Sequence, residues 1–228
     1  MPVAKVKFPP PLSPATTILV LSILKDSLFS CNHSTPDIQS FSPAGNGAPF
    51  PAGLNDCISG VEWLHENSES LRIDKTRIVV AGESGGGNLT LATGMSLKNE
   101  GKLDMIKGLY ALCPYIAGIW PLESNPSSIS NNGIFLDLSD NSGPVSYGID
   151  ELKNKNPLAW PGFAKIEDVK GLPKTHIHVN ECDPLRDEGY NFYKLLKEAG
   201  VDTDMSEAKG TIHAVSYTHL RAHETIQD

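Results

Sequence analysis

The feature that most restricts the fold of this chain is a short apolar run that ends in a glycine-rich turn. Residues 77–81 show no polar alternation, as in a strand that is buried on both faces of a parallel sheet. The turn Gly82-Glu83-Ser84-Gly85-Gly86 follows at once, and residues 86–98 carry apolar side chains at helical spacing. A strand, a sharp turn and a helix in direct succession predict a βα unit with a serine at its turn.

The rest of the chain continues this alternation of strands and helices. Apolar residues at three- and four-residue spacing predict a helix from about residue 49 to 69, and a second helix is expected over 187–199, where Gly200 ends it. Further strands are expected near 108–113, 176–182 and 202–206, whereas 114–173 shows no clear period. This order is typical of an α/β protein with a mostly parallel sheet flanked by helices.

The two ends of the chain depart from this pattern. Nine of the 17 prolines fall in the first 51 residues, and residues 1–43 show no period beyond the apolar run at 15–24. We expect 1–43 to be irregular and non-native, from a wrong reading frame or a misplaced start. Residues 216–225 match the translation of a common sequencing adapter, which predicts an artificial tail over 215–228. Residues 44–214 then form a partial domain.

Charge and composition exclude several classes of function. The net charge of −8 and the pI near 5.3 argue against nucleic acid and anionic membrane surfaces as partners. There is no run of about 18 apolar residues, so no membrane-spanning helix is expected. The four cysteines, Cys31, Cys57, Cys113 and Cys182, form no C-x-x-C pair, which predicts reduced thiols in the cytoplasm and no metal site. The composition leaves the oligomeric state open.

Ser84 is the candidate nucleophile. Its Gly-x-Ser-x-Gly pattern lies between a buried strand and a helix, as a nucleophile elbow requires. Side chains at Gly82 or Gly86 would strike the neighbouring strand and helix, and the N–H of Gly85 is expected to point at a substrate oxyanion. A phosphate-binding loop would have a lysine after the glycines, but Asn88 follows here.

A serine hydroxyl is a weak nucleophile, so a base and an orienting acid are needed, and at an elbow of this kind the acid precedes the base in the chain. Asp183 directly follows the strand at 176–182, at the sheet edge where sites of α/β proteins lie. Asp187 better suits the N-cap of the next helix. Glu181 is expected to point away, because side chains alternate along a strand. Asp183 is therefore the predicted acid.

His213 is the predicted base, because it lies in a loop after the last expected strand. His176 and His178 alternate within a strand, which indicates packing rather than catalysis. His65 lies on a helix face and is expected to be structural.

Three stretches together resemble the hormone-sensitive-lipase-like carboxylesterases, from about Ala44 to His213. They are Gly82-Glu83-Ser84-Gly85-Gly86, Asp183-Pro184-Leu185-Arg186-Asp187-Glu188-Gly189 and Gly210-Thr211-Ile212-His213. The resemblance implies an α/β-hydrolase fold with Ser84 as nucleophile, Asp183 as acid and His213 as general base. It also implies hydrolysis of small-molecule, short-chain esters through an acyl-enzyme intermediate, without a cofactor.

The chain also differs from that family. Members carry an upstream His-Gly-Gly-Gly stretch that supplies most of the oxyanion hole, and this sequence has none. We therefore expect a domain truncated at both ends, with residues 115–173 as a partial lid. Tyr115, Trp120 and Tyr147 are candidates to line an acyl or alcohol pocket, or alternatively ordinary core aromatics.

Two other functions remain open. A peptidase or amidase of the same fold would use the same triad, since both reactions pass through a tetrahedral intermediate. A catalytically inactive fragment is the other alternative, because the loss of one oxyanion donor costs about 10²–10³ in rate.

Overall fold

The computed structural model describes residues 17–22, 38–41 and 49–215, the first two ranges as backbone only. Their strands form one six-stranded sheet in the order β2-β1-β3-β4-β5-β6, in which every neighbouring pair is parallel. The predicted parallel α/β sheet is confirmed. The strand bounds are β1 Thr17–Ser22, β2 Ile38–Phe41, β3 Ile78–Glu83, β4 Gly108–Leu112, β5 Lys174–Asn180 and β6 Thr203–Ala208.

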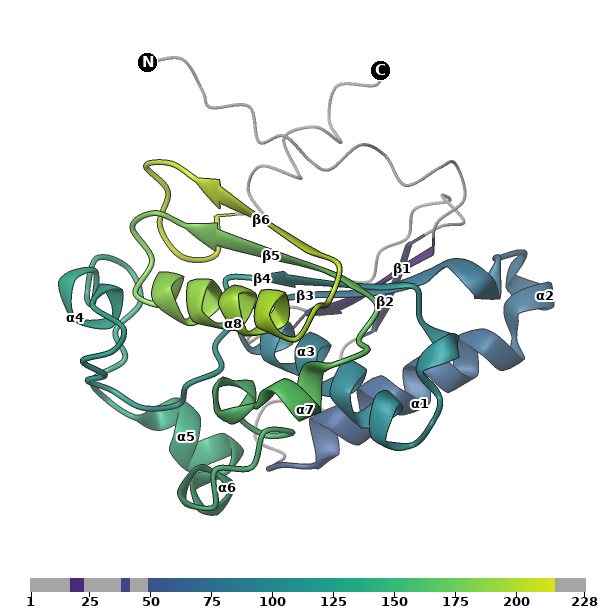
Figure 1. Cartoon of the computed structure of the whole chain (residues 1–228), viewed down its shortest axis with the longest axis horizontal. Helices are drawn as coiled ribbons and strands as arrows, with labels where there is room; N and C mark the ends of the chain where they lie inside the picture. The colour runs from purple at the N-terminus through teal and green to yellow at the C-terminus, as the bar shows by residue number, and fades with distance from the viewer. Residues whose placement is uncertain (1–16, 23–37, 42–48, 216–228) are drawn as a thin grey trace.

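Three long helices cover one face of this sheet (Figure 1). They are α1 Ala52–Glu66, α3 Gly85–Asn99 and α8 Arg186–Glu198, with the short α2 Ser68–Leu71 after α1. Alternate strand residues such as Val80, Leu109 and Ile177 face these helices and form the hydrophobic core with them. Because α3 is central, 12 of its 15 residues are buried.

Two glycines allow the helices to lie close to the strands. A Cβ atom at Gly189 of α8 would come within 2.5 Å of Val179 in β5. A Cβ atom at Gly94 of α3 would lie 2.5 Å from the side chain of Leu109 in β4. The tight packing of α8 on β5 sets the position of the strand end that precedes Asp183.

The sequence predicts an irregular segment between β4 and β5, but the structure has short helices there. It contains α4 Ser127–Ser130, α5 Ser142–Tyr147, α6 Ile149–Lys153 and α7 Ile166–Val169. The 3₁₀ turn η3 Pro161–Phe163 also lies in this segment, and the 3₁₀ turns η1 Lys75–Arg77 and η2 Leu103–Met105 lie before it. Helices of four to six residues are too short to show a period, which is why the sequence pattern missed them.

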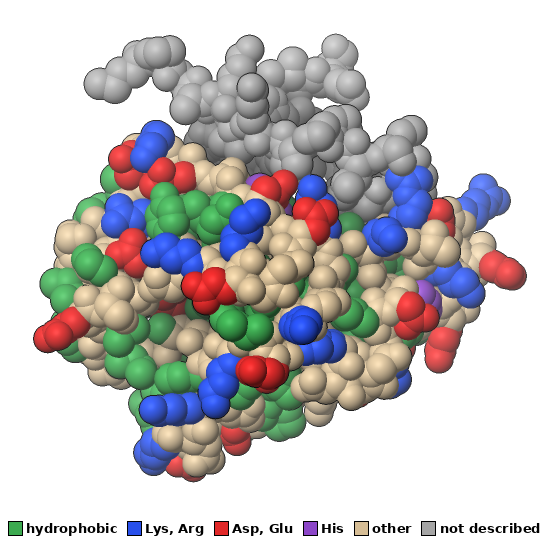
Figure 2. All heavy atoms as spheres, in the orientation of Figure 1, with side chains coloured by type: hydrophobic (Ala, Val, Ile, Leu, Met, Phe, Trp, Pro, Cys, Tyr) green, Lys and Arg blue, Asp and Glu red, His purple; other side chains and the backbone are tan. Residues whose placement is uncertain are grey.

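The surface of this inter-strand segment is unusually apolar. Most of the large exposed hydrophobic side chains of the described residues lie in it, namely Ile119, Ile129, Ile134, Phe135, Val145, Ile149 and Ile166. Figure 2 shows acidic and basic side chains interspersed over one face of the molecule, with apolar side chains between them.

The expectation that residues 1–43 are irregular is wrong for β1 and β2. β1 lies between β2 and β3 and pairs with β3 from Thr17 to Ser22. The apolar run at 15–24 contains this strand, but without a glycine turn and a following helix the sequence pattern assigned it no element. The other residues of 1–43, and the tail at 216–228, lie outside the described residues, so their origin stays a prediction. In the part of the chain that is described, no helix is long and apolar enough to cross a membrane.

Candidate active site

Ser84 occupies a strained turn between β3 and α3. Its backbone has φ 58° and ψ −118°, in the positive-φ region that a serine rarely adopts. The serine N–H donates to Leu112 O at 2.9 Å, and the serine carbonyl accepts from Tyr115 N at 3.0 Å. The end of β4 thus holds the turn from both sides and fixes Ser84 at the carboxyl edge of the sheet.

The glycines after Ser84 have two different tasks. A Cβ atom at Gly87 would lie 2.9 Å from Pro114 Cα and 3.0 Å from Leu112 O, so only glycine lets α3 start this close to β4. For Gly82 and Gly86 the same steric role stays a prediction. Gly85 begins α3, and the N–H groups of a first helical turn have no acceptor within the helix. The positive end of the helix therefore lies next to the Ser84 hydroxyl.

The structure brings Ser84, His213 and Asp183 together in one hydrogen-bonded chain. His213 Nε2 lies 3.0 Å from Ser84 Oγ, and His213 Nδ1 lies 2.8 Å from Asp183 Oδ2. Asp183 is completely buried, and its other oxygen accepts from Leu185 N at 2.8 Å. This arrangement orients the imidazole so that its free nitrogen faces the serine hydroxyl.

The end of β5 holds the loop that carries His213. Asn180 Nδ2 donates to Ile212 O at 2.6 Å, Cys182 N donates to Thr211 O at 2.9 Å, and Gly210 N donates to Glu181 Oε2 at 2.7 Å. Sequence reasoning considered Glu181 only as a weak alternative to Asp183 and did not single out Asn180. The sequence signal for Asn180 and Glu181 is that both lie within three residues of the predicted acid, Asp183.

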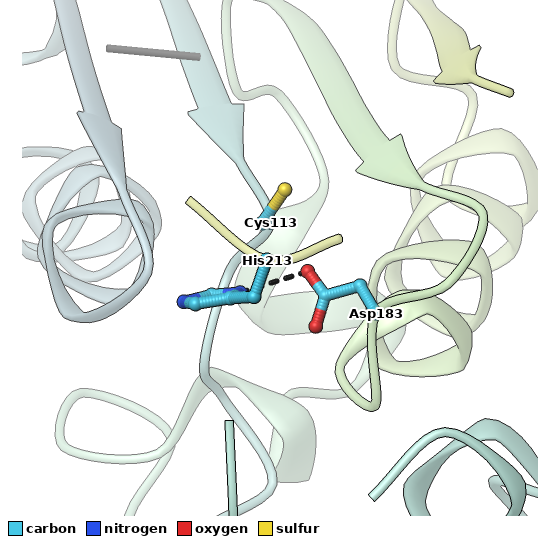
Figure 3. A group of neighbouring side chains, drawn as sticks. All are labelled: Cys113, Asp183 and His213. Atoms are coloured by element: carbon cyan, nitrogen blue, oxygen red, sulfur yellow. Dashed lines mark hydrogen bonds and ion pairs between the residues drawn. The ribbon is translucent and has the colours of Figure 1, made fainter. Parts of the chain in front are cut away.

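Cys113 is an unexpected neighbour of the predicted acid and base (Figure 3). Ligand atoms of Cys113, Asp183 and His213 all lie within 4.8 Å of one another, and all three residues are buried. Cys113 follows β4 with φ 41°, and its N–H donates to His178 O at 2.7 Å. Burial raises the pKa of the Cys113 thiol well above its ordinary value, and the nearby Asp183 and Glu83 carboxylates raise it further.

Glu188 holds the chain that follows Tyr115. Its Oε2 accepts from Ile116 N at 2.6 Å and from Ala117 N at 2.7 Å. Burial raises the pKa of Glu188 from 4.5 to about 8, although the two N–H groups act in the opposite direction. Glu188 also lines a cavity of about 240 Å³, whose lining includes none of the six side chains predicted for the triad and the pocket.

Two of the three aromatic candidates pack against a further aromatic side chain, Trp160. Tyr115 and Tyr147 flank Trp160 edge-to-face, with ring centroids 5.7 Å and 5.5 Å from it. Trp120 instead donates from Nε1 to Ser128 O at 2.8 Å. Asn88 ties this region to α3, because its Nδ2 donates to the carbonyl oxygens of Tyr115 and Ala159 at 3.0 Å each.

The two strand histidines, His176 and His178, lie outside the hydrogen-bonded chain of Ser84, His213 and Asp183. His176 Nε2 and His178 Nδ1 both lie 2.8 Å from Ser206 Oγ, and His176 also pairs with Asp204. Both histidines are buried on their strand, as packing predicts, and burial and the charge of His176 lower the pKa of His178.

His65 and Asp187 have structural contacts. His65 Nε2 lies 2.7 Å from Met105 O. The N-cap prediction for Asp187 is wrong, since Leu185 has that position, and Asp187 Oδ2 instead accepts from Ser127 N at 2.7 Å.

Comparison with known proteins identifies the family of the chain. Residues 46–216 match the family described as alpha/beta hydrolase fold. An arylesterase of Saccharolobus solfataricus is 36% identical over 171 residues, which cover 72% of this chain and 53% of the relative. The chain thus spans about half the length of that relative.

Solved structures give the same result. Esterase Est22 superposes with a TM-score of 0.82 at 48% identity, covering 88% of this chain and 66% of the other. Brefeldin A esterase, a bacterial homologue of human hormone-sensitive lipase, superposes with a TM-score of 0.77 at 32% identity, covering 97% and 67%. The resemblance to the hormone-sensitive-lipase-like esterases is confirmed, and the chain belongs to the alpha/beta hydrolase family.

Proposed function

We propose that this chain carries the catalytic residues of a serine carboxylesterase that hydrolyses short-chain esters of small molecules. The observation that carries the proposal is the unbroken contact chain from Ser84 Oγ through His213 to Asp183, at 3.0 and 2.8 Å. Both distances are within hydrogen-bond reach, which a nucleophile, its base and its orienting acid require.

In the proposed first half-reaction, Ser84 Oγ attacks the ester carbonyl while His213 Nε2 takes the serine proton. Asp183 accepts from Nδ1–H, which keeps the Nε2 lone pair directed at Ser84 and stabilises the imidazolium that forms. The N–H of Gly85, at the start of α3, donates to the oxygen that becomes negative. Collapse of the tetrahedral intermediate expels the alcohol, which takes the proton from His213.

In the second half-reaction, water attacks the acyl-enzyme and His213 again acts as the base. The proton passes from water to Nε2 and then to Ser84 Oγ as the carboxylic acid leaves. Every proton and bond in this cycle comes from Ser84, His213, the ester and water.

The proposed substrate is an ester with an apolar or aromatic part. Relatives are an arylesterase and Est22, whose structure with p-nitrophenol is known. Tyr115 and Tyr147 are proposed to line a pocket together with Trp160, and Trp120 stays a candidate for the same role. The exposed apolar residues of 115–173 support a lid role for this segment. Reduced Cys57, Cys113 and Cys182 fit a cytoplasmic location, which is also a proposal.

The test compares an ester with the matching amide. The proposal predicts that the 228-residue chain hydrolyses p-nitrophenyl acetate faster than p-nitroacetanilide and that Ser84→Ala loses this activity. Hydrolysis of neither compound would favour the catalytically inactive fragment. Faster cleavage of the anilide would favour an amidase instead. Equal ester turnover by Ser84→Ala would overturn the assignment of the nucleophile.

A further inference from the structure

The thiol of Cys113 is not used by the proposed reaction, although it lies beside two residues that are. Cys113 comes from the end of β4, Asp183 from the end of β5 and His213 from the loop after β6, and Figure 3 shows Cys113 beside the hydrogen bond that joins the other two. One sulfur, one nitrogen and one oxygen ligand atom lie within 4.8 Å of one another.

A thiolate, an imidazole and a carboxylate together are a set of ligands that Zn²⁺ and similar cations prefer. Zn²⁺ binds thiolate, imidazole and carboxylate groups, and an arrangement of three protein ligands with one open position is common. A thiolate ligand selects soft or borderline cations such as Zn²⁺ and Cd²⁺ over Mg²⁺ and Ca²⁺, which prefer oxygen. With one thiolate and one carboxylate, the bound divalent ion would be neutralised within a buried site.

A cation at these three residues requires the Asp183–His213 hydrogen bond to open. Bond lengths near 2.0 Å to nitrogen and oxygen and 2.3 Å to sulfur, at tetrahedral angles, separate the nitrogen from the oxygen by about 3.3 Å and the sulfur from either by about 3.6 Å. His213 Nδ1 and Asp183 Oδ2 now lie 2.8 Å apart, so they must separate by a few tenths of an ångström and the proton between them must leave. One ligand atom from each of the three residues lies within 4.8 Å of the others, so the sulfur must approach by up to about 1.2 Å.

We propose that Cys113, Asp183 and His213 form a binding site for one thiophilic divalent cation, and that this cation reversibly blocks the triad. The thiol proton leaves to solvent when the sulfur–metal bond forms. The ring proton of His213 is displaced from Nδ1, because that nitrogen gives its lone pair to the metal, and it moves through solvent to Nε2.

The shift of this proton explains the block. In the free protein Nε2 has the lone pair that faces Ser84 Oγ at 3.0 Å. With the metal on Nδ1, Nε2 holds a proton and has no lone pair to accept the serine proton. The inhibition rests on the proposed esterase function, but the metal binding itself does not.

The binding test uses Cd²⁺, whose bond to a thiolate gives a near-ultraviolet charge-transfer band. The 228-residue chain is titrated with Cd²⁺ in a buffer that does not bind metals. One equivalent should produce the band, Cys113→Ser should lose it, and Cys182→Ser should keep it. Ser84→Ala should also keep it, because Ser84 is not a ligand, so metal binding is measured even if the chain hydrolyses no ester.

A second measurement does not depend on the folding of a variant. X-ray absorption at the zinc edge of the wild-type chain with one equivalent of Zn²⁺ should show one sulfur neighbour at about 2.3 Å and nitrogen or oxygen neighbours at about 2.0 Å. A shell without sulfur, or a Cys113→Ser chain that gives the same cadmium band as wild type, would overturn the proposed site.

The regulatory part of the proposal has its own readout. In the active enzyme, Zn²⁺ should lower ester turnover at least tenfold, EDTA should restore it, and Mg²⁺ should have no effect. Cys113→Ser should need at least about ten times more Zn²⁺ for the same fractional inhibition of its own rate. Equal sensitivity of the two chains would overturn the regulation even where the binding signal is present.

Discussion

Asn180 donates a hydrogen bond from Nδ2 to the carbonyl oxygen of Ile212 at 2.6 Å, and Asn180 has no exposed surface. The bond joins the end of β5 to the residue before His213, so the strand positions the predicted base through the backbone. The geometry of the site therefore depends on a residue that acts through the backbone next to His213.

Asn180→Ala is expected to lower the free energy of unfolding by about 1–2 kcal/mol, because the carbonyl of half-buried Ile212 loses its donor. Ester turnover should fall as well, because the loop with His213 loses one of its anchors. Asn67→Ala is the control, since Asn67 donates to Trp63 O at 2.8 Å in an exposed position. Urea unfolding and turnover check both variants, and equal losses in the two would contradict the role of Asn180.

Asp183→Asn is expected to lower ester turnover by about 10⁴, because the amide favours the wrong tautomer of His213. Asp187→Asn is the matched control, because Asp187 contacts Ser127 and Arg186 rather than His213. Turnover of p-nitrophenyl acetate measures both, and a loss below tenfold in Asp183→Asn would mean that another group orients the base.

Gly87→Ala is expected to destabilise the chain by about 1–3 kcal/mol, because its Cβ atom would lie 2.9 Å from Pro114 Cα. The comparison is Gly53→Ala, where the nearest atom would be 3.6 Å away in the side chain of Leu89. That change within α1 should stabilise by about 0.5–1 kcal/mol, because alanine favours helix. Thermal unfolding of the two variants should therefore shift in opposite directions.

Glu188→Gln is expected to change how stability depends on pH. Glu188 has a pKa near 8 in the fold and 4.5 ordinarily, so between these values the unfolded chain binds fewer protons than the folded one. The free energy of unfolding of the wild type must then fall as pH rises through this window and level off above about pH 8. The Glu188→Gln chain keeps an acceptor for Ile116 N and Ala117 N but lacks this slope.

Urea midpoints of both chains from pH 5 to 9 measure that difference. The wild-type chain should lose stability relative to Glu188→Gln as pH rises. If the urea midpoints of the two chains change in parallel with pH, Glu188 has its ordinary pKa in the fold. Water must then reach its carboxyl group.

The sequence was sufficient to predict β3, the Ser84 turn and α3, since a buried strand, a forced glycine turn and an apolar helix all leave local patterns. It also predicted Asp183 and His213, because each follows a strand and parallel strands end at one edge of the sheet. Asn180, Glu188 and Cys113 could not be predicted in this way. Their contacts join residues far apart in the chain, and each residue type occurs elsewhere without such a role.

The strands β1 and β2 were missed for a different reason. β1 is as long as β3, but no glycine turn and no helical pattern directly follow the apolar run that contains it. Its identity depends on pairing with β3, which a local pattern does not contain.

The most direct test of the central claim is to treat the chain with a fluorophosphonate and locate the adduct by peptide mass spectrometry. Ser84 Oγ lies 3.0 Å from His213 Nε2 at the start of a helix, so the adduct should lie on Ser84. Labelling should vanish in Ser84→Ala and slow strongly in Asp183→Asn. An adduct on another serine, or equal labelling of Ser84→Ala, would contradict the account.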